Sequence, residues 1–152
     1  MNKRDHSNFL QRSESQSGQA LVETALVFII AVLFLAGLIE FGWAYFHYLA
    51  LQSAAGEGAA YGIVYPTWQD SADNPDPNNI TYRVQHESNS TLLDWSSTVV
   101  TVDAPFLTPG NHITVTVTYD YDPITPLLTP FLSGDSMTLS ATAVQQIVSP
   151  SH

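Results

Sequence analysis

The longest apolar run in the chain extends from Ala20 to Ile39, and within it only Glu23 is charged and only Thr24 is polar. Twenty helical residues rise about 30 Å, which is the thickness of a bilayer hydrocarbon core. No other segment of the sequence is apolar over such a length. We therefore predict a single transmembrane helix over residues 19–42.

Apolar and small residues continue beyond this run at the three- and four-residue steps of one helical face. They are Trp43, Phe46, His47, Ala50, Leu51, Ala54, Gly58 and Tyr61, with Gln52 opposite. Pro66 marks the end of the pattern, because proline removes a helical hydrogen bond. Residues 43–62 are thus expected to continue the helix outside the membrane. Trp43, Tyr45 and Tyr48 lie where an interfacial aromatic belt belongs.

Small residues at positions 50, 54, 55, 58 and 59 allow another backbone to approach this part of the helix closely. Two partners fit the pattern: the sheet of the same chain and the helix of another subunit. The sequence does not choose between them.

Residues 63–152 combine one further helical pattern with alternating patterns typical of strands. Asp70, Asp73 and Asp76 lie in a Pro- and Asn-rich loop that lacks the ligand order of an EF-hand calcium site. Asn79 then caps a helical pattern from Ile80 to about Leu92.

Strands are predicted at 98–102, 113–121 and 137–143, with a turn at Pro109-Gly110 between the first two. The middle strand gives the clearest signal, because apolar and aromatic residues alternate there with threonine and aspartate. The Pro-rich but apolar segment 122–135 is expected to fold back over the sheet. These elements predict an α+β fold, in which a long N-terminal helix, transmembrane in its first half, packs on a small antiparallel sheet.

The net charge of −10 is unevenly distributed along the 152 residues. Lys3, Arg4 and Arg12 precede the apolar run, whereas Arg83 is the only Lys or Arg after it. By the positive-inside rule, the N-terminus stays in the cytoplasm and residues 63–152 are exported. An acidic exported domain is a poor partner for nucleic acid. Because the chain has no cysteine, it has neither disulfides nor thiolate metal sites.

Residues 1–18 are polar and basic, and we expect a disordered cytoplasmic leader. An ordinary secretory signal has its small-residue cleavage site after the apolar region. Here Ser17-Gly18 precede that region, so a cut after Gly18 would leave the whole apolar helix on the mature protein.

This arrangement resembles the type IV prepilin signal, in which Gln19 would become the first residue and Glu23 the fifth. The resemblance implies that Glu23 pairs with the free amine of a neighbouring subunit's first residue. The alternative is an ordinary carboxylate near a helix N-terminus, which reaches the interface and is favoured by the helix dipole.

Three segments in order resemble TadE-like proteins, the pseudopilin-like components of tight-adherence (Tad or Flp) pilus systems. They are Gly18-Gln-Ala-Leu-Val-Glu23, Glu40-Phe-Gly42 and the alanine-rich stretch with Glu57-Gly58-Ala. The pilin-like fold that the family implies agrees with the α+β prediction. Glu23-Thr24 stands where major Flp pilins carry Glu-Tyr. Gln19 stands where pilins typically carry phenylalanine. Family members often have Arg or Lys near the glycine, whereas here Arg12 lies six residues before Gly18.

Catalytic motifs are absent from the sequence, which has no HExxH, GxSxG or phosphate-binding loop. Glu40 and Glu57 are about 25 Å apart on a helix, too far to share a substrate. We predict solvated or subunit-pairing roles for both, and no catalytic, cofactor or metal site.

Two functions remain. The favoured one is a minor pseudopilin or assembly component of a Tad-type pilus or secretion system. It would be a single-pass protein of the cytoplasmic membrane, entering a surface pilus after processing. Its partners would be membrane lipid, other pilin-like or Tad subunits and a prepilin peptidase. The alternative is an uncleaved, membrane-anchored exported domain that binds a polymer or an envelope protein.

Overall fold

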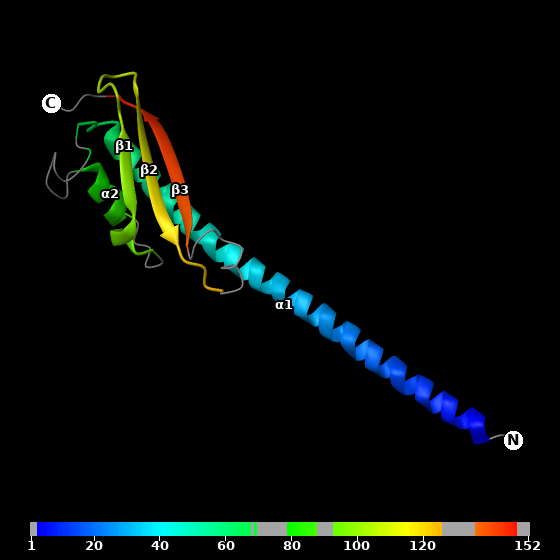
Figure 1. Ribbon diagram of the computed structural model, residues 1–152. Helices are drawn as coiled ribbons and strands as arrows, with labels where there is room; N and C mark the ends of the chain where they lie inside the picture. The colour runs from blue at the N-terminus through cyan, green and yellow to red at the C-terminus, as the bar shows by residue number, and fades with distance from the viewer. Residues whose placement is uncertain (1–2, 68, 70–78, 88–92, 126–135, 149–152) are drawn as a thin grey trace. The chain divides into compact units, whose positions relative to one another are not determined.

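The computed structural model describes residues 3–67, 69, 79–87, 93–125 and 136–148, and the side chains of these residues except 3–17 and 87. The elements are helix α1 (Lys3–Gly62), helix α2 (Ile80–Glu87), the 3-10 turn η1 (Trp95–Ser97) and strands β1 (Val99–Asp103), β2 (His112–Tyr121) and β3 (Met137–Gln146). The predicted class is confirmed: a long N-terminal apolar helix packs against a three-stranded antiparallel sheet in a pilin-like α+β arrangement (Figure 1).

Helix α1 ends at Gly62, as the sequence pattern predicted, but it begins at Lys3 rather than at Gln19. The expectation of a disordered leader is therefore wrong for residues 3–18. The leader contains no proline, and it precedes a strongly helical run. Extending an existing helix costs much less than nucleating a new one, so the run propagates toward the N-terminus.

The chain divides into two compact units, Met1–Ile39 and Glu40–His152. The described part of the first unit is helix alone. The second unit contains the outer part of α1, helix α2 and the sheet, and has a hydrophobic core of its own.

The sheet has the order β1-β2-β3, and both neighbouring pairs are antiparallel. In the register, Val102 lies opposite Val115, and Val115 lies opposite Ala143. Gly110 has a φ of 93° in the predicted turn between β1 and β2, a conformation that suits glycine. The β2–β3 pairing continues past Gln146, because the Ile147 amide donates to the Asn111 carbonyl over 2.8 Å.

The core lies between the outer part of α1, helix α2 and one face of the sheet. Its fully buried members are Leu51, Ala54, Ala55 and Ala59 of α1, Ile80 and Val84 of α2, and Ile113, Val115 and Val117 of β2. The alternation in β2 thus points its aliphatic residues inward, as predicted. Each large aliphatic side chain buried in this way stabilises the fold by about 1.5–3 kcal/mol.

Helix α2 begins where the sequence predicted, with Asn79 as its cap. The Tyr82 amide donates to the Asn79 Oδ1 over 2.6 Å, which satisfies a backbone donor at the helix start. The predicted continuation toward Leu92 lies outside the described residues, as do Asp70, Asp73 and Asp76 and most of the segment expected to fold over the sheet.

Candidate functional site

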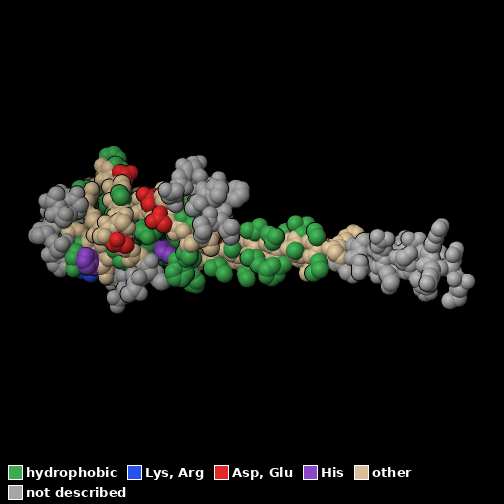
Figure 2. Space-filling view, turned by 60° about the horizontal axis from the view of Figure 1, so that its bottom comes forward, with side chains coloured by type: hydrophobic (Ala, Val, Ile, Leu, Met, Phe, Trp, Pro, Cys, Tyr) green, Lys and Arg blue, Asp and Glu red, His purple; other side chains and the backbone are tan. Residues whose placement is uncertain are grey.

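The apolar run of α1 is exposed on every side of the helix. Consecutive residues from Leu26 to Ile30 are all more than half exposed, and residues spaced by 100° cover the full circumference. Figure 2 shows hydrophobic side chains, in green, along this stretch of the helix. Within the described residues, Gly18–Gly62 is the one helix long and apolar enough to cross a membrane, judged by length and composition. A helix apolar all round fits a lipid or protein surround better than water.

The predicted processing and pairing residues lie at the start of this run. Gly18, Gln19 and Glu23 are exposed, and the helix continues without interruption through Gly18 and Gln19. The Thr24 hydroxyl donates to the Ala20 carbonyl over 2.8 Å, which satisfies the hydroxyl within its own helix. Glu23 thus remains the one charged side chain in the run from Ala20 to Ile39.

Glu40 is only 3% exposed and accepts four hydrogen bonds. Its Oε1 accepts from the Tyr121 hydroxyl at 2.5 Å and from the Ile124 amide at 2.9 Å. Its Oε2 accepts from the Thr125 amide and from the Thr125 hydroxyl, both at 2.9 Å. One carboxylate therefore joins α1 to the end of β2 and the loop that follows it.

The prediction of a solvated or subunit-pairing role for Glu40 is wrong. All four donors are neutral groups of the same chain, from residues 81 to 85 positions away in the sequence. A buried carboxylate is tolerated when charge-assisted hydrogen bonds replace its hydration. The acceptor capacity of both oxygens is used inside the domain, so this group has a structural role.

His47 lies two helical turns after Glu40 on the same face and is 4% exposed. Its ring stacks on Tyr119 with centroids 5.8 Å apart and meets the edge of Tyr121 at 5.1 Å. The His47 Nδ1 lies 2.9 Å from the Trp43 carbonyl oxygen, so this nitrogen carries the proton and donates. The histidine and both tyrosines form an aromatic layer, which contacts the Glu40 carboxylate through the Tyr121 hydroxyl.

The two tyrosines of this layer have perturbed acidity. Burial raises the pKa of Tyr121 well above its ordinary value, and the hydrogen bond to the Glu40 carboxylate raises it further. Burial also raises the pKa of Tyr119, with a smaller contribution from the Asp122 carboxylate. Both shifts favour the neutral phenol, which in Tyr121 is the form that donates to Glu40.

The third family segment divides between solvent and core. Glu57 is exposed, in line with a solvated role, whereas Gly58 is buried. A Cβ added at Gly58 would overlap the Val84 Cγ2 methyl of α2. The sequence allowed two partners for the small residues of α1: the same chain's sheet or another subunit's helix. In the structure, Ala54, Ala55, Gly58 and Ala59 are buried in the chain's own core. Gly42 is partly exposed, and apart from its own stretch of helix backbone no atom of the described residues lies within 4 Å of an added Cβ.

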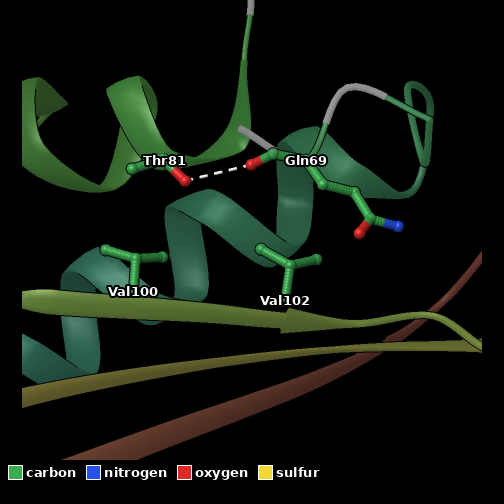
Figure 3. Close-up of a pocket in the computed structure, with 4 residues that line it drawn as sticks. All are labelled: Gln69, Thr81, Val100 and Val102. Atoms are coloured by element: carbon green, nitrogen blue, oxygen red, sulfur yellow. Dashed lines mark hydrogen bonds between the residues drawn. The ribbon is translucent and has the colours of Figure 1, made fainter. Parts of the chain in front are cut away.

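Described residues of the second unit line at least two hollows. The larger, which we call the α1–β3 groove, has a volume of about 340 Å³ and is lined by Phe41, Ala44, Tyr45, Tyr48, Met137 and Leu139. The smaller, of about 90 Å³, lies between Val100 and Val102 of β1 and the hydrogen bond from the Thr81 hydroxyl to the Gln69 carbonyl (Figure 3). None of the four described side chains that line it is titratable.

The described part of the chain offers few side-chain groups suited to catalysis. It contains no group of three His, Asp or Glu side chains able to hold a metal ion. Glu40, the one buried carboxylate among the described residues, accepts its hydrogen bonds from neutral donors. The arrangement is suited to holding a helix against a sheet.

Sequence reasoning missed Tyr121, Ile124 and Thr125 as partners of Glu40. A signal was present: Glu40 and His47 are polar residues two turns apart on an otherwise apolar helical face. The strand alternation also pointed Tyr121 inward. Such a pattern indicates an internal polar cluster, although it does not identify the donors.

Comparison with protein families gives one finding: residues 18–60 match the family model described as TadE-like protein. No curated protein and no solved structure matches the chain. The match begins at the glycine before Gln19 and includes Glu23, Glu40, Gly42, Glu57 and Gly58. It covers the apolar run and nearly all of the helix that packs on the sheet. Residues 18–60 of the chain therefore form a TadE-like family domain.

Proposed function

We propose that this protein is a minor pseudopilin or assembly component of a Tad-type pilus or secretion system. The observation that carries the proposal is the TadE-like match over residues 18–60, on a helix whose apolar side chains are exposed on every side. Such a surface needs lipid before assembly and can pack against other apolar helices afterwards. The pilin-like packing of the same helix on a sheet supports this role.

In this proposal the chain inserts with its basic N-terminus in the cytoplasm and residues 63–152 outside. A peptidase cuts after Gly18, and Glu23 pairs with the new N-terminal amine of a neighbouring subunit. Because an isolated carboxylate is costly in an apolar surround, this pairing would favour the assembled state.

The N-terminal peptide of the protein from native membranes tests the processing step. Mass spectrometry is expected to find a mature chain that starts at Gln19. A chain that starts at Met1 or Asn2 would rule out prepilin-type processing.

The role of Glu23 is tested by Glu23→Gln and Glu23→Ala. Both variants are expected to insert normally, since they make the run more apolar, but to reduce assembly. Immunoblots of the membrane fraction measure insertion, and sheared surface filaments measure assembly. Glu57→Gln is the matched control, because Glu57 is an exposed carboxylate on the same helix. Normal piliation in both Glu23 variants would contradict the pairing role.

One observation favours the second candidate, an uncleaved membrane-anchored binding domain. Helix α1 passes through Gly18 and Gln19 without a break, whereas proteolysis favours exposed loops. If this candidate is correct, the leader is retained and the domain works when attached to another membrane anchor. Loss of function in that chimera would count against it.

A further inference from the structure

The exposed surface of α1 stays apolar well beyond the end of the apolar run. Phe41 is 71% exposed, Tyr45 51% and Phe46 58%, and the remaining large side chains up to position 49 are also partly exposed: Trp43, Tyr48 and Leu49. Gln52 is the first exposed residue of this part of the helix with a side chain that is neither apolar nor aromatic.

The two polar residues that would interrupt this surface are turned inward. Glu40 is held by Tyr121, Ile124 and Thr125, and His47 is stacked on Tyr119. Judged by hydropathy along the sequence, the apolar stretch therefore ends at Ile39. The exposed surface of the folded helix, however, stays apolar beyond this residue. From Glu40 to Leu49 the helix rises about 13 Å. This exceeds one headgroup layer, roughly 5–8 Å by the difference between total and hydrocarbon thickness.

The α1–β3 groove opens on this same surface. Four of its lining residues, Phe41, Ala44, Tyr45 and Tyr48, lie on α1, and Met137 and Leu139 belong to the start of β3. The Phe41 and Tyr45 rings stack with centroids 6.3 Å apart and form part of one wall. No charged side chain lines the groove among the described residues, and Glu40, next to Phe41 in the chain, is turned away to its internal donors.

We propose that the α1–β3 groove binds a lipid acyl chain, and that the base of the exported domain is immersed in the outer interfacial layer of the membrane. The inference rests on the proposed function, because it requires that the apolar run spans the bilayer. The groove starts two residues after Ile39 on the same helix, so lipid of the span is its nearest neighbour in sequence. A peptide strand would need backbone hydrogen bonds that apolar walls do not provide.

The chain provides a selective probe, because Met1 and Met137 are its two methionines. Photo-methionine incorporated into the full chain therefore places a photoreactive group in the groove at Met137. The protein is reconstituted into vesicles of phosphatidylethanolamine and phosphatidylglycerol, irradiated, and digested for mass spectrometry. A matched variant, Met137→Leu with Ser140→Met, moves the probe three residues along β3 to an exposed position. A second, Met137→Leu with Phe34→Met, moves it into the apolar run.

Lipid adducts are expected at positions 34 and 137, at least about tenfold above those at position 140. Burial of two acyl-chain methylenes in the groove, at about 0.8 kcal/mol each, would already raise the lipid occupancy near position 137 by that ratio. Adducts at 34 but not at 137 overturn the groove and leave the proposed membrane span intact. Absence of adducts at 34 overturns the span and the inference with it. The same probe irradiated in native membranes tests the other occupant: a cross-link from Met137 to a second polypeptide in place of lipid overturns the inference.

Discussion

Glu40 is a residue of the TadE-like segment that binds to a part of the chain outside this segment. The carboxylate belongs to the second family segment, Glu40-Phe-Gly42, yet its donors Tyr121, Ile124 and Thr125 lie beyond residue 60, where the family match ends. The charge is satisfied by neutral donors alone, so it depends on the geometry of the loop after β2. Conversely, that loop depends on the carboxylate, since two of its backbone amides have Glu40 as an acceptor. Each holds the other in place.

Glu40→Ala is expected to destabilise the second unit, Glu40–His152, by roughly 2–4 kcal/mol, because buried donors are left without an acceptor. Glu40→Gln should lie between this variant and the native protein, since glutamine keeps one carbonyl oxygen. The measurement is the urea unfolding midpoint of the full chain in detergent, followed by near-ultraviolet circular dichroism. Glu57→Ala, an exposed carboxylate on the same helix, should change stability by less than about 0.5 kcal/mol. Equal effects at both positions would contradict the role of Glu40.

The raised pKa of Tyr121 predicts a loss of stability in alkali. The folded state favours the neutral phenol, whereas tyrosine in the unfolded chain ionises near its ordinary pKa of 10.0. The stabilisation is therefore complete below pH 10 and declines as the pH rises above it. Unfolding free energies at about pH 8 and about pH 11 measure the effect. Tyr121→Phe should be less stable at the lower pH but should lose less on alkalinisation; an unchanged alkaline loss would contradict the assignment.

At the scale of elements, α1 presents two different surfaces along one helix. Up to Ile39 its apolar residues are exposed all round, whereas from Leu51 to Ala59 alanines and a glycine face helix α2 and the sheet. Small residues keep the backbones close, so the helix and the sheet share a thin core that has little room for added atoms.

Gly58→Ala tests this close approach. The added methyl would overlap Val84, and overpacking of this kind typically destabilises by roughly 1–3 kcal/mol. Gly56→Ala is a matched control two residues earlier, because no atom lies within 4 Å of its added Cβ. It should be neutral or stabilising by up to about 1 kcal/mol, since alanine favours the helix. Thermal unfolding of the two variants compares them; a destabilised Gly56→Ala would show that the effect is not packing.

The elements themselves were largely predictable, because their signals are local. Alternation over His112–Tyr121 and the Asn79 cap each need only a few neighbouring residues, and both predictions are confirmed. The helix over residues 43–62 was also predictable, from the three- and four-residue spacing of its apolar and small residues. The helical leader was missed because polar composition was taken to mean disorder, although the apolar run beside it extends the helix.

The buried site was not predictable to the same extent, because its contacts join distant parts of the chain. Hydropathy places Glu40 at the end of an apolar run, where a solvated carboxylate is the ordinary expectation. Its burial depends on Thr125, which lies 85 residues later in the chain. Periodicity identifies which face a residue is on, whereas the donor that meets it there is set by tertiary packing.

At the scale of the whole molecule, basic residues, the apolar run and most of the carboxylates come one after another along the chain. Three basic residues precede the apolar run, and ten carboxylates follow it between Glu57 and Asp135. Glu23 and Glu40 are the two acidic residues of the helix between Ala20 and Ser53, and of these Glu40 is hydrogen-bonded inside its own unit. This distribution supports the proposed insertion with residues 63–152 outside, and it leaves Glu23 for an intermolecular role.

The orientation can be tested directly because the chain has no cysteine of its own. Thr101→Cys places a single thiol at an exposed position of β1, which a membrane-impermeant maleimide should label in intact spheroplasts. Replacing Lys3, Arg4 and Arg12 with glutamine while Gln52 and Ser53 become arginine reverses the charge asymmetry. It should therefore lower the labelled fraction. Thr101→Cys that is labelled only after lysis would mean that the domain faces the cytoplasm, and would exclude a place in a surface pilus.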